Sequence, residues 1–449
     1  MLYYSTNKKA RKIRFRDALL KGLAEDGGLF MPESIPTIDL SEINAMKEMD
    51  YPEIAFRIVN KFLSEEIPEN DLRRLINDAY NYQVPLEKVF DRNYVMRLDQ
   101  GPTASFKDFA ARLMGRLMQY YLALNRSKLL ILTATSGDTG SAIANAFYGL
   151  DNIKVVVLFP KLEVTARQRK QMTTLGKNIE IISIEGKFDD CQALVKKAFI
   201  DPELAHLPLS SANSINIGRL IPQTVYYFYA YAKLFEQAGE QIIFSVPSGN
   251  FGDLMGGLIA KHMGLPVHKF VVATNENDEF PLYTETGEYR VISPSRNCIS
   301  SAMNVGHPSN VARLIDLYGG NMNEKGIILE PADLERIRSD IYAISITDKE
   351  TEETISKEWP EHKLLLEPHG AVGWAGLMNY LHNNPEDKSK ICVSLETAHP
   401  AKFPEKIQEL LKLDPSLPPS LQGLDEKEEY IVPMKGDYES FHQYLKENY

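Results

Sequence analysis

The stretch LLILTATSGDTGSAIANAF, residues 129–147, combines a continuous apolar run, a turn-rich loop and a segment with helical spacing. The run LLILTA is long enough for a strand, and the loop after it contains Gly137 and Gly140. Nearly continuous apolar strands that lead into helices are typical of parallel sheets covered by helices on both faces. The stretch therefore predicts an α/β fold.

The same rhythm recurs from about residue 93 onward. Strand, loop and helix follow one another again in QIIFSVPSGNFGDLMGGLIA (241–260) and ICVSLETAHPAKFPEKIQELL (391–411). Ligands in open α/β sheets bind at the carboxyl ends of the strands, where these loops lie. We therefore predict two doubly wound open sheet units that flank one cleft. The apolar runs expected as strands are residues 129–134, 154–159, 179–184, 241–246, 268–274 and 391–395.

The chain divides into three parts by pattern. Residues 1–92 are expected to form a mainly helical N-terminal domain, with helical apolar spacing over 51–82. Residues 93–215 are expected to form a small α/β domain and residues 216–449 a large one. The tail after Leu413 is rich in proline and charge, so we expect it to follow the surface.

Composition excludes several classes of protein. The 449 residues are 44% hydrophobic and 25% charged, as in ordinary soluble globular proteins. A net charge of −11 argues against nucleic acid as a partner. No apolar run approaches the roughly 20 residues that span a bilayer, so no membrane association is expected. Three scattered cysteines without zinc spacing predict no metal site, and they favour a reducing, cytoplasmic location.

The loop PSGNFGDLMGG, residues 247–257, has the features of a phosphate cup. Gly249, Asn250 and Gly252 follow a strand and precede a helix, so backbone N–H groups and the helix dipole can face an anion without any cation. The loop lacks both the GK[ST] of a Walker motif and the GxGxxG of a dinucleotide site. Taken alone, a tight connection remains the commoner explanation.

A second polar loop, TSGDTGSA (135–142), also opens a helix. The hydroxyls of Thr135, Ser136 and Thr139 and the helix N-terminus would suit a carboxylate or a phosphate. Asp138 has two interpretations at this point, because it could equally serve as the N-cap of the helix.

LETAHPAKF, residues 395–403, is the third loop. Thr397 lies just past a buried strand, where a hydroxyl can bond a heteroaromatic nitrogen. His399 beside Pro400 invites an acid–base role, although a structural role is more typical of such a histidine. Lys402 is either a surface lysine or an anion ligand.

The segment NSINIGRLIPQT, residues 213–224, gathers Asn213, Ser214, Asn216 and Arg219 into one polar turn before an apolar helix. EPHGAVGW (367–374) provides a further helix entrance and contains His369. Both segments are candidates for the cleft.

Lys107, in GPTASFKDFAARLMG (101–115), sits among apolar neighbours at the expected start of a helix. Desolvation lowers the pKa of a lysine, and the resulting neutral amine forms Schiff bases with carbonyl groups. An ordinary ion pair with Asp108 is the commoner role for a single lysine. A phosphate cup and a hydroxyl loop in the same chain favour the first role, because pyridoxal phosphate carries an aldehyde, a phosphate and a ring nitrogen.

These segments resemble blocks of the threonine synthase family in its enterobacterial and fungal branch. That family consists of pyridoxal-phosphate enzymes of fold type II, and the resemblance covers nearly the whole chain. The blocks are GPTASFKDF, TATSGDTGSAIANAFYGL, FDDCQALVKKAF, SANSINIGRL, VPSGNFGDL and LETAHPAKF, with LAEDGGLFMPE near the N-terminus.

The resemblance implies roles for individual residues. Lys107 would hold pyridoxal phosphate as a Schiff base, and Thr397 would hydrogen-bond its ring nitrogen. The cofactor phosphate would be bound by Gly249, Asn250, Phe251 and Gly252, with Asp253 at the helix start. The substrate would be bound by Thr135, Ser136, Asp138, Thr139, Asn213, Ser214, Asn216, Arg219 and, less directly supported, Lys402.

The implied reaction converts O-phospho-L-homoserine and water into L-threonine and phosphate in a monomer or homodimer. Asp138 departs from related lyases of the same fold, which carry asparagine there to contact the 3′ oxygen of the cofactor. A carboxylate beside a phenolate is repelled, so Asp138 either shares a proton or turns away to cap its helix. Alternatives to a synthase are a dehydratase or cysteine synthase, a lyase that only eliminates phosphate, and a noncatalytic sensor, which would not need Lys107.

Overall fold

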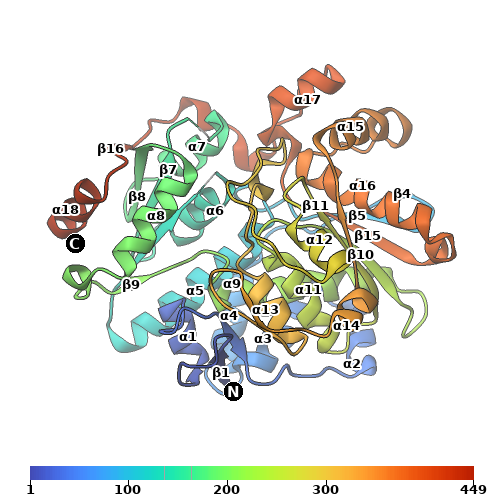
Figure 1. The fold of residues 1–449 in the computed structure, drawn as a ribbon, viewed down its shortest axis with the longest axis horizontal. Coiled ribbons are helices and arrows are strands. Elements are labelled where there is room, and N and C mark those ends of the chain that lie inside the picture. Colours follow the sequence, from blue (N-terminus) through green and yellow to red (C-terminus); the bar gives the residue numbers. More distant parts are fainter. Residues whose placement is uncertain (136, 163) are drawn as a thin grey trace.

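The computed structural model describes residues 1–135, 137–162 and 164–449. Two sheets, each covered by helices, lie side by side above a mainly helical N-terminal region (Figure 1). This arrangement confirms the predicted α/β class and its two sheet units. Each predicted apolar run forms a strand, namely β6 (Leu129–Ala134), β7 (Ile153–Pro160), β8 (Ile179–Glu185), β10 (Ile242–Pro247), β11 (Val267–Thr274) and β15 (Ile391–Glu396).

The larger sheet has six strands in the order β14-β11-β10-β15-β5-β4. Its other members are β4 (Leu86–Phe90), β5 (Asn93–Arg97) and β14 (Ile341–Ser345), and only the β4–β5 pair is antiparallel. Phe244 and Val272 join the core cluster under α10 (Val225–Leu234) and α11 (Gly252–His262), whereas Ile243 and Val271 join the cluster under α16 (Pro368–Asn383). Successive side chains of a strand face opposite sides, so these apolar runs bury both faces of the sheet.

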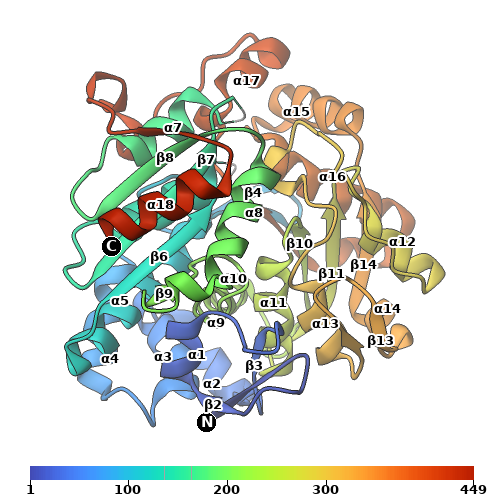
Figure 2. The same cartoon turned by 60° about the vertical axis from the view of Figure 1, so that its left-hand side comes forward.

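The smaller sheet has five parallel strands in the order β16-β8-β7-β6-β9, with β9 at Leu209–Ser210 and β16 at Val432–Lys435. Helices α5 (Lys107–Asn125) and α6 (Asp138–Phe147) pack on one face, where Ile131 lies in the main core. Helices α8 (Phe188–Phe199) and α18 (Tyr438–Asn448) cover the other face, where Leu130 and Leu132 lie (Figure 2).

The N-terminal region supplies the helices expected there and a small sheet that was not expected. In α3, Asp50 accepts a hydrogen bond from the backbone of Glu53, and Pro52 occupies the first turn, both common at helix starts. The ring of Tyr51 packs against Phe109 of α5 and Tyr229 of α10, which joins this region to both sheet units. Its elements are β1 (Leu2–Ser5), β2 (Ile13–Arg14), α1 (Phe15–Lys21), β3 (Phe30–Pro32), α2 (Leu40–Ala45), α3 (Tyr51–Leu63) and α4 (Glu69–Ala79).

The division of the chain at residues 92 and 215 stays a prediction, but two strands lie outside the units expected for them. Strand β5, placed in the small domain by sequence, pairs with β15 in the larger sheet. Strand β16, in the tail placed in the large domain, pairs with β8 of the smaller sheet. Burial and register decide which strands pair. A division of the sequence at one residue therefore does not separate the two sheet units.

Among the remaining elements, α7 packs against α6 and β8 of the smaller unit, and β12 and β13 pair as a separate two-stranded sheet. Among the described residues, no helix combines the length and the apolar character needed to cross a bilayer. These elements are α7 (Ala166–Thr173), α9 (Ile217–Leu220), α12 (Glu279–Thr286), α13 (Val311–Leu317), β12 (Asn321–Met322), β13 (Ile328–Glu330), α14 (Leu334–Asp340), α15 (Asp348–His362) and α17 (Pro404–Leu411).

Candidate active site

A cavity of about 630 Å³ lies at the carboxyl ends of β6, β10 and β15, between the two sheets. Lys107 lines it, together with Thr135, Asp138 and Thr139 from the loop after β6. Residues 247–253, from the end of β10 to the start of α11, and Thr397 from the loop after β15 also line it. The three loops singled out in the sequence therefore meet in one place, where the carboxyl ends of strands from the two sheets face one cavity. Ser136, predicted in the same set, lies outside the described residues.

Lys107 is the first residue of α5, and its side chain is 14% exposed. Its Nζ lies 3.9 Å from Asp138 Oδ2. Burial lowers the pKa of Lys107, although the charge of Asp138 opposes this effect. The ordinary ion pair with Asp108 is not formed, because the Asp108 carboxylate accepts instead from the backbone and hydroxyl of Thr103 at 2.8 and 2.7 Å.

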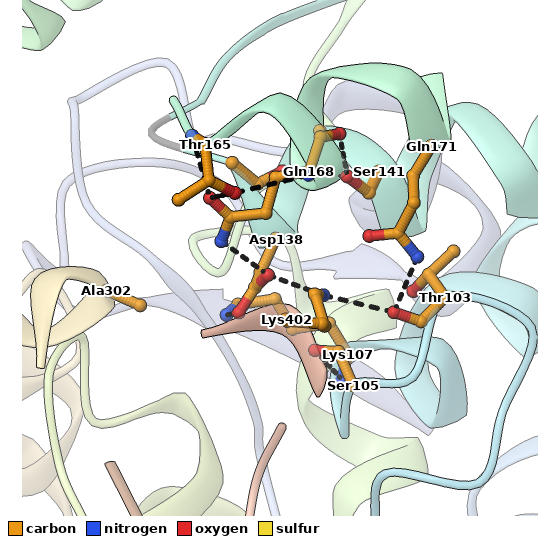
Figure 3. Close-up of polar contacts among 12 residues, drawn as sticks. Thr103, Ser105, Lys107, Asp138, Ser141, Thr165, Gln168, Gln171, Ala302 and Lys402 are labelled. Carbon is orange, nitrogen blue, oxygen red and sulfur yellow. Dashed lines mark hydrogen bonds and ion pairs between the residues drawn. The ribbon is translucent and has the colours of Figure 1, made fainter. Parts of the chain in front are cut away.

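Asp138 does not cap its helix, contrary to one of its two interpretations. Gly137 occupies the N-cap position, and Thr135 Oγ1 accepts from the backbone N–H groups of Gly137 and Gly140 at 2.9 and 2.8 Å. The carboxylate of Asp138 instead lies 2.6 Å from Lys402 Nζ and accepts from Gln168 Nε2 at 2.9 Å (Figure 3). Burial raises the pKa of Asp138, but Lys402 and Lys107 together hold it well below its usual range.

Lys402 is fully buried, so its interpretation as a surface lysine is wrong. It lies in a short 3-10 turn, η6 (Pro400–Lys402), and donates to the backbone carbonyl of Thr103 at 3.0 Å. Within the described residues it does not line the cavity. This geometry does not favour the predicted contact with a substrate phosphate.

The predicted phosphate cup forms the turn between β10 and α11. Phe251 adopts a left-handed conformation (φ 61°), and the helix begins at Gly252. A Cβ at Gly249 would lie 3.0 Å from both Ala302 O and Met303 Cα, so the backbone passes too close for a side chain. The first N–H groups of a helix have no partner within the helix and can bind an anion.

Asp253 lies in the first turn of α11 and lines the cavity. The hydroxyls of Tyr226 and Tyr227 donate to its Oδ1 at 2.5 and 2.7 Å. Its Oδ2 is buried and has no hydrogen-bond partner among the described residues. Burial raises the pKa of Asp253 to about 6, although the two tyrosines oppose the change. A protonated Oδ2 can donate to an anion in the cup.

Thr397 follows β15 directly, and its backbone carbonyl accepts from Phe106 N at 2.9 Å, next to Lys107. In the described part of the chain its hydroxyl makes no hydrogen bond, which leaves it free to bond a ring nitrogen. His369 also lines the cavity. Its Nε2 accepts from Ala302 N at 3.0 Å, so the proton sits on Nδ1, 2.5 Å from Glu367 Oε2. His399 instead accepts from Ala401 N through Nδ1, which favours its structural interpretation.

The polar turn 213–219 divides into two groups. Asn213, Ser214 and Arg219 line the cavity. Arg219 is buried and donates to Ala212 O at 2.9 Å, while its Nε has no partner among the described atoms. Burial lowers the pKa of Arg219 to about 10. Asn216 differs, because its Oδ1 caps α9 and its Nδ2 donates to Leu19 O and Ser211 O at 2.9 Å each. The side-chain amide of Asn216 therefore makes its hydrogen bonds outside the cavity.

Sequence reasoning missed residues that hold this site from a distance. Gln168 of α7 bonds Asp138, and Arg313 of α13 donates to Ser214 O and Ile215 O at 3.2 and 2.7 Å. Asn310 donates to Asn250 O at 2.9 Å, which fixes the cup. Each partner is distant in sequence, and the local patterns are those of ordinary helices, so no signal marks them.

Family models cover nearly the whole chain. "Threonine synthase N terminus" matches residues 2–80, "Pyridoxal-phosphate dependent enzyme" matches residues 84–396, and "Threonine synthase, C-terminal" matches residues 370–445. Threonine synthase of Haemophilus influenzae is 40% identical over 99% of each chain, and that of Escherichia coli is 39% identical over 94% of each. The chain belongs to the threonine synthase family. The resemblance found in the sequence is confirmed.

Solved structures of the threonine synthase family share the fold throughout. A crystal structure of pyridoxal-phosphate-bound threonine synthase from Brucella melitensis has a TM-score of 0.91 at 36% identity, covering 100% of this chain and 99% of that one. The threonine synthase of Escherichia coli gives 0.88 at 36% identity, with 100% of both chains covered. A tomato threonine deaminase, at 16% identity and a TM-score of 0.55, shares only the fold.

The cavity of this threonine synthase family member fits pyridoxal phosphate by its own chemistry. Lys107 offers an amine to an aldehyde, and the N–H groups at the start of α11 offer donors to a phosphate. The free hydroxyl of Thr397 lies on the same wall. These are the three contacts that the cofactor requires, although each residue's role remains a proposal.

Proposed function

We propose that this chain is a threonine synthase, which converts O-phospho-L-homoserine and water into L-threonine and phosphate as the last step of threonine biosynthesis. The observation that carries the proposal is Lys107, a lysine only 14% exposed on the wall of a cavity that also contains a cation-free phosphate cup. A noncatalytic binder would need the cup but not the lysine.

Bound pyridoxal phosphate supplies an electron-withdrawing ring that stabilises negative charge on the carbon beside the substrate amine. Residues of the chain carry out the proton transfers and set the state of the ring nitrogen. Lys107 moves protons at two adjacent carbons of the substrate, and burial lowers its pKa, which favours the neutral amine that a base requires. Thr397 presents a hydroxyl rather than a carboxylate, so it does not force a proton onto the ring nitrogen.

The departing phosphate needs local donors, since the protein carries a net charge of −11. We assign this role to Asn213, Ser214 and Arg219, which share one stretch of the cavity wall. The guanidinium of Arg219, with its unpaired Nε, is the cation of the set. Thr135 and Thr139 remain candidates for the substrate carboxylate at the start of α6.

Incubation of the purified protein with O-phospho-L-homoserine tests the proposal, with threonine and phosphate measured together. Equal amounts of both are expected, and the Lys107→Ala variant should form neither. Phosphate accompanied by 2-oxobutyrate would mean that the chain is an eliminating lyase. Absence of phosphate would mean that the substrate is wrong.

We propose a cytoplasmic location for the enzyme. The three cysteines of the chain are buried and lie far apart in the sequence, which supports a reducing, cytoplasmic location. A monomer or a homodimer is proposed for solution, and light scattering would decide between them.

A further inference from the structure

Two buried ammonium groups share one carboxylate beside the cavity. Lys402 Nζ lies 2.6 Å from Asp138 Oδ1, and Lys107 Nζ lies 3.9 Å from Asp138 Oδ2. The side chains of Lys402 and Asp138 are 0% and 3% exposed. Burying a lysine without access to the cavity or to solvent is costly, so its position requires a reason.

Contacts around Lys402 connect both sheet units to the segment that carries Lys107. The lysine follows β15 of the larger sheet, whereas Asp138 follows β6 of the smaller one. Lys402 also donates to Thr103 O, a carbonyl that accepts from Gln171 of α7 at 2.9 Å (Figure 3). Arg167 of α7 donates to the carbonyl of Ala401, next to Lys402. The turn η6 is therefore fastened to α7 and to the loop before Lys107.

The charge of Asp138 would, by itself, keep Lys107 protonated. A carboxylate within about 4 Å favours the charged form of an amine, and a lysine serves as a base only when its amine is neutral. Lys402 neutralises the charge of the Asp138 carboxylate, and its own positive charge repels that of Lys107. The other charged groups that face Lys107 from neighbouring elements are Arg219, Glu367 and Asp253.

We propose that Lys402 is a positioning residue for the reaction: it neutralises Asp138 and fixes that carboxylate against Lys107, so that Lys107 can release a proton near neutral pH. The role rests on the proposed function, and it differs from a contact with the substrate phosphate. Asp138 then orients the amine of Lys107 without keeping it in the protonated form.

The test is a double-mutant cycle in the full-length holoenzyme, with Asp138→Asn, Lys402→Met and the double variant. The first readout is the pH midpoint of the absorbance change of the bound cofactor, measured without substrate. Lys402→Met should raise the midpoint by about one pH unit or more, and Asp138→Asn should lower it. The double variant should lie closer to Asp138→Asn than the sum of the two single displacements predicts, because Lys402 acts through Asp138.

The second readout is turnover at neutral pH. Lys402→Met should lower kcat about tenfold for each unit of midpoint displacement, with KM little changed. Lys406→Met is a matched control, because Lys406 pairs with Glu352 and Glu409 away from the cavity. Its midpoint and kcat should equal those of the wild type.

Several outcomes would overturn the proposal. A raised KM with an unchanged midpoint in Lys402→Met would make Lys402 a substrate ligand. Additive effects in the double variant would mean that the two charges act independently. If Lys402→Met does not fold, the Asp138→Asn variant still tests the proposal. An unchanged or raised midpoint in Asp138→Asn would contradict the role proposed for the Asp138–Lys402 pair. A wild type that forms no threonine would defeat the proposed function alone, because the midpoints need no substrate.

Discussion

The two ends of the cavity hold charge by opposite means. At the cup, residues 249–253 include no lysine, arginine or histidine, the donors are backbone N–H groups, and burial raises the pKa of the one carboxyl group, Asp253. At the other end, Lys107 and Asp138 line the cavity, and the fully buried Lys402 pairs with Asp138 from behind the wall, so that three charged groups form one cluster. The cup therefore depends on the path of the backbone, whereas the lysine end depends on a balance of charges.

This difference predicts which substitutions matter at each end. The cup should tolerate a change of charge and should be sensitive to an added carbon atom. The lysine end should tolerate small changes of shape and should be sensitive to an unbalanced charge.

The largest effect is expected from Lys107→Ala at the lysine end. The variant loses both the covalent attachment of the cofactor and the base, so turnover should fall by at least about 10³-fold. Threonine formation and the absorbance of the bound cofactor measure it. Lys349→Ala, a surface lysine paired with Glu353, is the control. A variant at Lys107 that keeps both its colour and its turnover would remove the lysine from the chemistry.

Gly249→Ala should break the cup by shape alone. Its Cβ would lie 3.0 Å from Ala302 O and Met303 Cα, whereas at Gly252 the nearest atoms are 3.6 Å away. We expect the affinity for pyridoxal phosphate to fall about 10- to 100-fold in Gly249→Ala, equivalent to roughly 1.4–2.8 kcal/mol, and less in Gly252→Ala. Equilibrium titration of the apoprotein with the cofactor checks this order. Equal losses would mean that the close approach at Gly249 is not what shapes the cup.

Asp253→Asn tests whether the cup accepts a neutral group. The pKa of Asp253 in the folded protein is about 6, above its ordinary value of 3.8, so the stability from its proton is lost as pH rises through 6. That displacement of the pKa corresponds to roughly 3 kcal/mol at most. Asparagine carries no charge, so the variant should gain stability over the wild-type apoprotein at pH 8 more than at pH 5. Thermal unfolding at both pH values measures this difference, and a gain independent of pH would contradict it.

The smallest catalytic effect is expected from Asn216→Ala. The residue caps α9 and lies outside the cavity wall, so its loss should cost about 1–2 kcal/mol of stability and leave KM nearly unchanged. Asn213→Ala is the comparison, because Asn213 lines the cavity and its loss should raise KM. Urea unfolding and steady-state kinetics separate the two effects. A raised KM in Asn216→Ala would return that residue to the binding site.

The strands predicted from sequence are those that the fold buries on both faces. The runs 129–134 and 391–395 were visible because continuous apolar runs leave few alternatives. Strand β14 was missed, since IYAIS is a half-buried edge strand, and β16 was missed because VPMK contains a proline. Hydrophobic periodicity and composition indicate which strands are buried, and edge strands bury few of their side chains.

The parts of the candidate site that could be predicted are those in which a residue lies in a characteristic local sequence. Lys107 and residues 249–253 could be found in this way. The role of Asp138 could not, because its partners Lys402 and Gln168 are distant in the chain and only the fold brings them together. Local capping rules suggested an N-cap for Asp138, and the ion pair with Lys402 outweighed them.

Strand β16 has a consequence for the order in which the molecule can assemble. It pairs with β8, and α18 covers the apolar face to which Leu130 and Leu132 belong, yet both elements lie far downstream of that sheet. Until they are synthesised, β8 is an open edge beside exposed apolar surface, which invites association with other nascent chains. We therefore expect ribosome-bound chains that lack residues 432–448 to depend on chaperones more than full-length chains do.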